Sequence, residues 1–258
     1  MTEGAGPLIL GLPHTGTWVP PEVGQRLNAE GRRLADTDWH IDTLYQGLVP
    51  DVTVVRANFH RYVIDANRDP SGASLYPGQN TTGLVPESDF DGRPIWDDPV
   101  SPAEVEERRQ KYHAPYHAAM EAQIARIQAL HGVAIHYDCH SIRSRIPHLF
   151  DGVLPDFNIG TNGGTTCAPQ IEAAVLARLR GESHVLNGRF RGGWTTRHYG
   201  RPAQGRHAIQ MELAQSTYLQ AEEAPWHPDA AKVVRLRAIL AGILSDIIAL
   251  APVLKVSP

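Results

Sequence analysis

The stretch LILGLPHTG, residues 8–16, decides the fold because it joins an apolar run directly to a polar corner. An apolar run over residues 7–12 is typical of a short strand that is buried on both faces. The corner PHTG follows it and places His14 where the strand ends. A histidine held there is a candidate ligand or catalytic group, although most histidines in turns only complete a hydrogen bond.

Outside this stretch, segments with strand patterns alternate with segments of helical periodicity. Strands are predicted near 51–59, 133–141, 184–187 and 207–213, and helices over 36–48, 101–131, 168–180 and 228–250. Ser101 opens the second helix with a capping box, and Pro115 is expected to kink it. The alternation predicts an α/β fold with a central mixed, mostly parallel sheet flanked by helices. We expect one domain over residues 1–258.

Several stretches between these elements carry loop signals. Residues 69–100 and 147–166 are rich in Gly, Pro and Asn and predict loops, and residues 190–202 predict a loop or hairpin. RYVIDANR (61–68) is expected to be extended. A loop as long as 69–100 inside a compact domain indicates a functional role.

Composition excludes several classes of protein. The 258 residues carry a formal net charge of -4, with 42% hydrophobic and 20% charged residues, so neither nucleic acid nor a membrane surface is an expected partner. Cys139 and Cys167 form no disulfide framework, and the N-terminus has no basic region before an apolar run. A cytoplasmic location is therefore expected. The apolar stretch 233–250 contains three charged residues and is expected to be too polar and too short for a membrane span.

Polar residues lie where three of the predicted strands end. They are His14 after the first, Asp138 and His140 in the strand at 133–141, and Glu212 in the late strand. Asp38 opens the helix that follows the first strand. The carboxyl ends of parallel strands form one edge of a sheet, which is where ligands bind in open α/β folds. We therefore expect these side chains to meet.

Two imidazoles and one carboxylate are a ligand set for catalytic zinc. Zinc lowers the pKa of bound water to about 7, and a further carboxylate is needed to move the proton. Glu212 suits that task because its apolar strand should raise its pKa. A structural ion pair is the alternative interpretation of Glu212. His113 and His117, four residues apart, are a weaker metal pair because the Glu of HExxH is missing and Pro115 lies between them.

Arg61, Asn67 and Arg68 supply forked donors after the second strand. Such donors bind a carboxylate or an oxyanion. The alternative is that Arg68 only pairs with a nearby acid, Asp65 or Asp69.

Seven motifs together resemble the N-formylglutamate amidohydrolase family, over about residues 7–220. In order along the chain they are PHTG, DTDWHIDTLY, RYVIDANRDP, LYPGQNTTGL, DCHSIRS, GGWTTRHYG and QMELAQSTY. The family is similar in fold to zinc carboxypeptidases and to the aspartoacylase group. The resemblance implies a zinc-carboxypeptidase-like fold and one divalent metal ion, with zinc expected.

The resemblance also implies roles for individual residues. His14 and His140 match the two metal-binding histidines. The relatives carry HxxE at the first site, whereas Thr17 stands three residues after His14, so Asp38 is taken as the carboxylate ligand and Asp36 as its rival.

Other residues match the catalytic and substrate-binding parts of the family pattern. Glu212 matches the catalytic Glu and Arg61 the residue that polarises the scissile carbonyl. Asn67 and Arg68 match the pair that holds the substrate α-carboxylate. A second carboxylate, on the side chain of the substrate, would need a positive charge beside it. For that reason alone Arg197 or Arg143 is considered as its partner.

The implied activity is hydrolysis of a linear amide, N-formyl-L-glutamate, to L-glutamate and formate, the last step of one branch of histidine degradation. One alternative is a zinc hydrolase of another N-acyl amino acid. The other is a non-catalytic domain of the same fold that only binds an amino acid.

Overall fold

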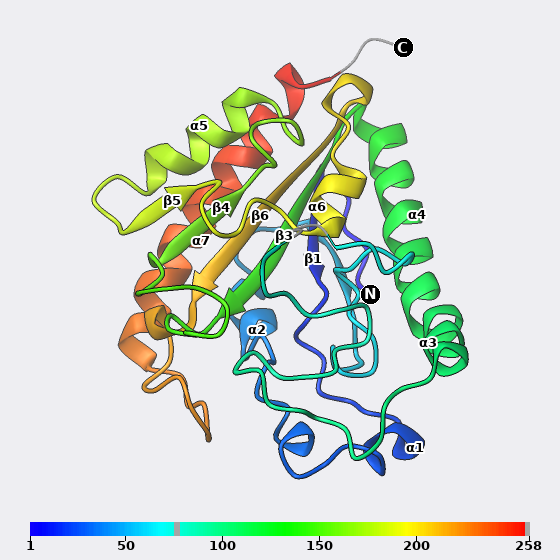
Figure 1. Ribbon diagram of the computed structural model, residues 1–258. Coiled ribbons are helices and arrows are strands. Elements are labelled where there is room, and N and C mark those ends of the chain that lie inside the picture. Colours follow the sequence, from blue (N-terminus) through cyan, green and yellow to red (C-terminus); the bar gives the residue numbers. More distant parts are fainter. Residues whose placement is uncertain (75–77, 256–258) are drawn as a thin grey trace.

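The computed structural model describes residues 1–74 and 78–255, and these residues contain one six-stranded sheet (Figure 1). The strand order is β2-β1-β3-β6-β4-β5. The bounds are β1 (Leu8–Leu12), β2 (Thr53–Arg56), β3 (Ala134–Ile142), β4 (Phe157–Gly160), β5 (His184–Leu186) and β6 (Arg206–Ala214). Residues 75–77, which open the LYPGQNTTGL motif and belong to the predicted 69–100 loop, lie outside the described residues.

The sheet is mixed and mostly parallel, as predicted. β1 is parallel to β2 and β3, and β3 is parallel to β6. β4 is antiparallel to β6 and parallel to β5. The prediction of a loop over 147–166 is wrong at β4, because a strand of four residues gives too short a pattern to stand out from its Gly- and Pro-rich surroundings.

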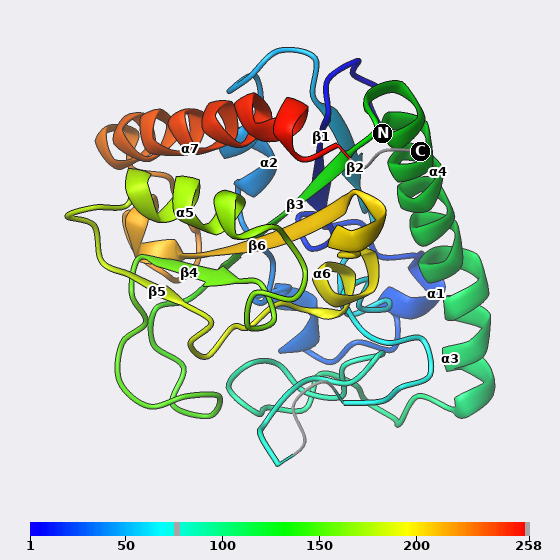
Figure 2. The ribbon, with the colours of Figure 1, turned by 90° about the horizontal axis from the view of Figure 1, so that it is seen from above.

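Helices cover both faces of the sheet (Figure 2). The helical elements are α1 (Pro21–Gly24), α2 (Ile41–Tyr45), α3 (Pro102–Arg108), the π-helical turn η2 (Arg109–His113), α4 (Ala114–His131), α5 (Pro169–Arg178), α6 (Trp194–Tyr199) and α7 (Ala230–Leu250), with short 3-10 turns at η1 (Gly31–Arg33), η3 (Pro202–Gln204), η4 (Gln215–Thr217) and η5 (Ala251–Val253).

Three predicted segments differ from the structure. The helix expected over 36–48 is only α2, and the extended segment expected at 61–68 consists of turns. The loop or hairpin expected over 190–202 contains α6. Its sequence, WTTRHY, has weak helix propensity, so tertiary contacts decide its conformation.

The long helix expected over residues 101–131 begins and ends where the sequence predicted. The Ser101 side chain accepts a bond from the Glu104 backbone N–H, and Gly132 ends α4 in the left-handed conformation. Between α3 and α4 the chain forms the π-helical turn η2, and Pro115 follows it in the first turn of α4. Because Pro115 cannot donate a backbone hydrogen bond, the regular helical ladder is interrupted there.

Alternate residues of the central strands face different surroundings. In β3, Ile135, Tyr137 and Cys139 join the main core with α5 and α7, and the odd-numbered apolar residues of β6 do the same. His136, Asp138 and His140 alternate with them and therefore point to the opposite face. This face carries the polar row from which the site is built.

The C-terminal helix meets the length and composition of a membrane span. An 18-residue stretch within Ala230–Val253 has a mean hydropathy of 1.9, so the expectation that this segment is too short and too polar is wrong on those criteria alone. In the structure, Leu236, Leu240 and Ile243 pack in the main core. Two of its charged residues are also held by the protein: Asp246 pairs with Arg178 of α5, and Arg237 donates to two carbonyls of α2. These contacts pack one side of α7 against the main core of the fold.

Candidate active site

His14 is held at the end of β1 by close backbone packing. A Cβ atom on Gly16 would lie 2.4 Å from backbone atoms of Asn58 and Phe59, so a glycine is required at this point of the corner. The backbone N–H of Asp38 donates to the His14 carbonyl over 3.1 Å. This bond brings the start of the α2 segment against the corner and sets Asp38 beside His14.

His140 and Glu212 are direct neighbours in the sheet. The register of β3 and β6 pairs His140 with Glu212, and both side chains are buried. Because the strands are parallel and in register, the two side chains leave the same face of the sheet. The expectation that these strands end together with β1 is confirmed, since β3 also pairs with β1.

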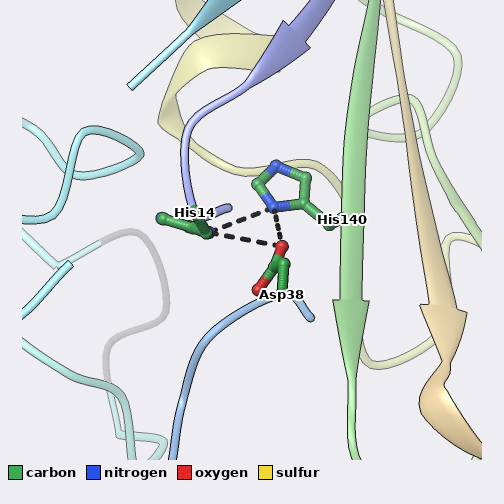
Figure 3. Close-up of side chains that lie close together, drawn as sticks. All are labelled: His14, Asp38 and His140. Carbon is green, nitrogen blue, oxygen red and sulfur yellow. Dashed lines mark hydrogen bonds and ion pairs between the residues drawn. The ribbon is translucent and has the colours of Figure 1, made fainter. Parts of the chain in front are cut away.

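His14, Asp38 and His140 converge from three separate segments (Figure 3). The Nδ1 atoms of His14 and His140 are 3.2 Å apart. Asp38 Oδ2 lies 3.3 Å from His140 Nδ1 and 3.8 Å from His14 Nδ1. The three side chains are buried, and one donor atom from each lies within 4.8 Å of the others.

The donor atoms fit a divalent cation. In a tetrahedral zinc site, metal–ligand bonds of about 2.0–2.1 Å place neighbouring donor atoms about 3.3 Å apart. The measured separations of 3.2, 3.3 and 3.8 Å are of this size. Two imidazoles and a carboxylate also have the chemistry that such a cation prefers.

A buried carboxylate orients His14. Asp65 Oδ1 lies 2.7 Å from His14 Nε2. An ionised carboxylate only accepts hydrogen bonds, so Nε2 carries a proton and Nδ1 is the ring atom turned toward Asp38 and His140. Arg61 Nη2 donates to the other oxygen of Asp65 over 2.8 Å. The charges of Arg68, His14 and Arg61 outweigh burial and hold the pKa of Asp65 well below its usual range.

His140 has its own neighbours on the protein side. Its Nε2 lies 3.1 Å from Asp138 Oδ1 and 3.1 Å from Asn67 Nδ2. The hydroxyls of Thr195 and Thr196 in α6 donate to Asp138 Oδ2. The short helix α6 is therefore fixed by the polar row beneath His140. Because these tertiary contacts and not local helix propensity set its conformation, the local sequence did not predict it.

The pKa values of the two carboxylates of the site, Asp38 and Glu212, are shifted in opposite directions. Burial alone would raise the pKa of Asp38, but His14 and His140 outweigh it and hold this pKa below its usual range. Burial raises the pKa of Glu212 to about 8, against a smaller lowering by His140. The expected rise at Glu212 is thus confirmed in direction. Asp38 is suited to hold a cation, and Glu212 is suited to exchange a proton near neutral pH.

Asp36, the rival of Asp38, has other partners. Its Oδ2 accepts bonds from the Tyr62 hydroxyl at 2.8 Å and from the Phe90 backbone N–H at 3.0 Å. Burial raises the pKa of Asp36 to about 7. Asp38 is the carboxylate that the structure brings to the two histidines.

A small cavity opens over these residues. Its lining includes His14, His140 and Glu212 and also Arg61, Asn67 and Arg68, so the structure brings most of the sequence-predicted residues together. Arg143 and Arg197 are not among the described residues of the lining: Arg143 pairs with Asp91 over 3.0 Å, and Arg197 Nε donates to the Gly192 carbonyl.

His113 and His117, considered above as a weaker metal pair, contact backbone carbonyls. His113 Nε2 lies 3.1 Å from the Arg68 carbonyl, and His117 Nε2 lies 2.9 Å from the Ala66 carbonyl. His117 Nδ1 also contacts the Tyr199 hydroxyl at 2.7 Å. Both histidines therefore brace the backbone of the segment that carries Asn67 and Arg68.

Sequence reasoning gave no role to two carboxylates that orient the site. Asp138 lies two residues before His140 in the same motif. The hydroxyls that hold its carboxylate come from Thr195 and Thr196 in α6, far along the chain. Asp65 was considered only as a partner for Arg68, from which it lies 3.7 Å away. The position of Asp65 between Arg61 and Arg68 in RYVIDANR was the available signal, but its pairing with His14 depends on the fold.

The fold is α/β, and its site has the groups of a hydrolase: a buried His–Asp–His group beside a carboxylate of raised pKa. The family model for N-formylglutamate amidohydrolase matches residues 6–219. The chain therefore belongs to the N-formylglutamate amidohydrolase family.

Individual relatives agree with this assignment. The chain is 45% identical over 255 residues to the N-formylglutamate deformylase of Pseudomonas aeruginosa, with 96% of this chain and 94% of the relative covered. It is 45% identical over 228 residues to the N-formylglutamate deformylase of Pseudomonas putida, with coverage of 86% and 85%. The crystal structure of N-formylglutamate amidohydrolase from Ralstonia eutropha JMP134 is similar, with a TM-score of 0.79, 30% identity and coverage of 95% and 94%. A protein from Agrobacterium tumefaciens at 20% identity shares the fold, with a TM-score of 0.70 and coverage of 95% and 92%.

Proposed function

We propose that this protein hydrolyses N-formyl-L-glutamate to L-glutamate and formate with the help of one divalent cation, zinc by preference. The observation that carries the proposal is the convergence of His14, Asp38 and His140 beside Glu212 in a cavity lined by arginines. The family membership supports the linear amide as the bond that is cleaved. We place the reaction in the cytoplasm, as the last step of one branch of histidine degradation.

His14, Asp38 and His140 are the residues that would hold the cation. A bound divalent cation would supply Lewis acidity, which lowers the pKa of water and polarises a carbonyl. The protein's contribution is to keep the three donor atoms together in a buried place. Asp65 fixes the proton of His14 on Nε2, so that Nδ1 faces the other two donors.

Glu212 is proposed as the group that moves the proton. It takes a proton from the attacking water while the water oxygen bonds to the formyl carbon. The carbon–nitrogen bond then breaks, and Glu212 returns the proton to the leaving amine of glutamate. A pKa of about 8, raised by burial, suits both directions of transfer near neutral pH.

Arg61 is proposed to stabilise the negative charge that develops on the formyl oxygen. It lines the cavity and is itself buried, so its charge acts in a medium of low dielectric constant. Its bond to Asp65 over 2.8 Å and its position 4.8 Å above the Phe90 ring fix the guanidinium in place. A preorganised cation of this kind needs no rearrangement during the reaction.

Asn67 and Arg68 are proposed to receive the substrate α-carboxylate. Three bonds hold the Arg68 guanidinium: to the Thr82 carbonyl and hydroxyl at 2.9 Å each and to the Asn67 carbonyl at 3.1 Å. The Asn67 side chain is fixed by the Thr195 backbone N–H, which donates to Asn67 Oδ1 over 3.0 Å. Rigid donors of this type are suited to a planar carboxylate.

We also assign residues 1–258 to one catalytic domain. The family model ends at residue 219, but α7 beyond it packs against α5 and contributes to the main core. Its removal would expose that face of the sheet.

The test is product analysis with purified protein. N-formyl-, N-acetyl- and N-succinyl-L-glutamate are offered in parallel, and formate, acetate, succinate and free glutamate are measured. We expect formate and glutamate in equal amounts from the first compound and little release from the others. Faster release of acetate or succinate would favour a different acyl group, and binding of glutamate without any hydrolysis would favour a non-catalytic binding protein.

A further inference from the structure

Gln210 of β6 lies between the proposed general base and the first residue of the α6 segment. Its side chain is buried, lines the cavity and leaves the same face of the sheet as Glu212, two residues further along the strand. Gln210 Nε2 donates to Glu212 Oε2 over 3.0 Å, and Gln210 Oε1 accepts the Gly193 backbone N–H over 2.6 Å. The proposed reaction gives this bridging amide no role.

Gly193 fixes the orientation of the Gln210 amide. A backbone N–H can only donate, so the amide oxygen must face Gly193 and the NH2 group must face Glu212. Asn67 packs directly on Gly193, where a Cβ atom would lie 2.3 Å from Asn67 Nδ2. The amide therefore cannot turn round without losing both of its hydrogen bonds.

The fixed amide makes the two carboxylate oxygens of Glu212 different from each other. An amide NH2 group only donates, so Oε2 serves as the acceptor of the Gln210 bond. Within residues 1–74 and 78–255, no group of the protein forms a hydrogen bond to Glu212 Oε1. Oε1 is thus the oxygen that is left to exchange a proton with a water molecule.

We propose that Gln210 is a positioning residue for the hydrolysis: it holds Oε2 of Glu212 and so aims Oε1 at the attacking water. The inference deepens the proposed function and rests on it for the role of Glu212 as the base. A general base must lie within hydrogen-bond reach of the proton that it takes, and a small displacement slows the transfer steeply. An amide that joins a strand side chain to a fixed backbone N–H supplies this precision without adding a charge.

The first experiment removes the bridging amide. Gln210→Met keeps the approximate size of the side chain and loses both hydrogen bonds. We expect kcat for formate release from N-formyl-L-glutamate to fall by about 10- to 100-fold, the range for loss of a hydrogen bond to a charged group, with KM changed by less than about 3-fold. Circular dichroism confirms that the variant is folded.

Gln123→Met is the matched control. Gln123 is also a buried glutamine whose amide joins two partners, since its Nε2 donates to Glu3 and its Oε1 accepts from Arg126. It lies on α4, outside the described lining of the cavity. Gln123→Met should therefore keep the wild-type kcat.

A double-mutant cycle separates positioning of Glu212 from loosening of the Gly193 segment. If Gln210 acts through Glu212, Gln210→Met should lower kcat by less than about 2-fold when Glu212→Gln is already present. A change that only loosens the segment would slow the Glu212→Gln enzyme as much as it slows the wild type. Gln210→Asn keeps an amide but is one methylene shorter and cannot reach both partners, so it gives the same test if Gln210→Met does not fold.

The proposal is overturned if the folded Gln210 variant keeps the wild-type kcat, if its effect falls on KM instead of kcat, or if its effect is the same with and without Glu212. Each of these results leaves the proposed function in place as long as Glu212→Gln alone is slow. Failure of the proposed function looks different. The wild type then releases no formate, or Glu212→Gln is as fast as the wild type, and the positioning role of Gln210 is refuted with it.

Discussion

The Nδ1 atoms of His14 and His140 lie 3.2 Å apart, although 126 residues separate them in the sequence. Parallel pairing of β1 with β3 brings the two strand ends together, and the backbone bond from Asp38 to His14 adds the carboxylate. The sheet therefore brings together residues that share no local motif.

Glu212→Gln should keep the cation and lose turnover. The substitution preserves the size of the side chain but removes the group that takes and returns the proton. We expect kcat to fall by about 100-fold or more, which corresponds to about 3 kcal/mol. Formate release and metal content are measured on the same sample, with Glu223→Gln at an exposed position as the matched control. A Glu212→Gln enzyme as fast as the wild type would show that another group is the base.

Asp65→Asn should weaken the binding of the cation. The variant can no longer hold the His14 proton on Nε2 as a carboxylate does, and it also leaves Arg61 without its closest charged partner. Loss of such a partner lowers metal affinity by about 10- to 100-fold. Competition with a chromogenic chelator measures the affinity, and circular dichroism confirms that the variant is folded. Unchanged affinity in a folded variant would mean that Asp65 does not orient His14.

Much of this arrangement could be predicted from the sequence. Buried parallel strands carry continuous apolar runs, and their carboxyl ends must share one edge, so His14, His140 and Glu212 stood out at strand ends. Asp38 followed from its position at the start of the next helical segment. The mixed, mostly parallel sheet followed from the alternation of strands and helices.

The remaining parts depend on contacts between distant segments. β4 and α6 have four and six residues, and neither has a local pattern strong enough to outweigh its surroundings. Thr195 and Thr196 hold α6 against Asp138, and Asp65 reaches His14 from a turn. Such pairings are set by the tertiary fold and leave no spacing in the sequence.

Asp36→Asn should change how stability depends on pH. Burial raises the pKa of Asp36 to about 7, so the folded state keeps this proton at pH values where the unfolded state has lost it. The Asp36 contribution to the free energy of unfolding is therefore largest below about pH 4, falls as the pH rises, and levels off above about 7. Asn does not titrate.

The comparison uses urea unfolding of the wild type and Asp36→Asn between pH 5 and 8. Relative to the wild type, the variant should gain on the order of 2–4 kcal/mol of stability across this range. Parallel pH profiles for the two proteins would show that Asp36 is ionised in the folded state.

His117→Phe should act on substrate binding more than on the chemical step. The variant loses the bond to the Ala66 carbonyl, next to Asn67, and the contact with the Tyr199 hydroxyl. We expect KM for N-formyl-L-glutamate to rise by about 3- to 10-fold, the effect of one or two neutral hydrogen bonds, with kcat less affected. His117→Gln keeps a donor and should recover part of the loss. A fall in kcat at unchanged KM would contradict this bracing role.

The most direct test of the central claim is metal content measured together with formate release. Purified protein is analysed for divalent metals, stripped with a chelator and then reconstituted with zinc, beside a His14→Ala variant treated in the same way. We predict close to one ion per chain in the wild type, loss of activity on stripping, recovery on reconstitution, and neither ion nor activity in His14→Ala. Full formate release by metal-free wild-type protein would contradict the account.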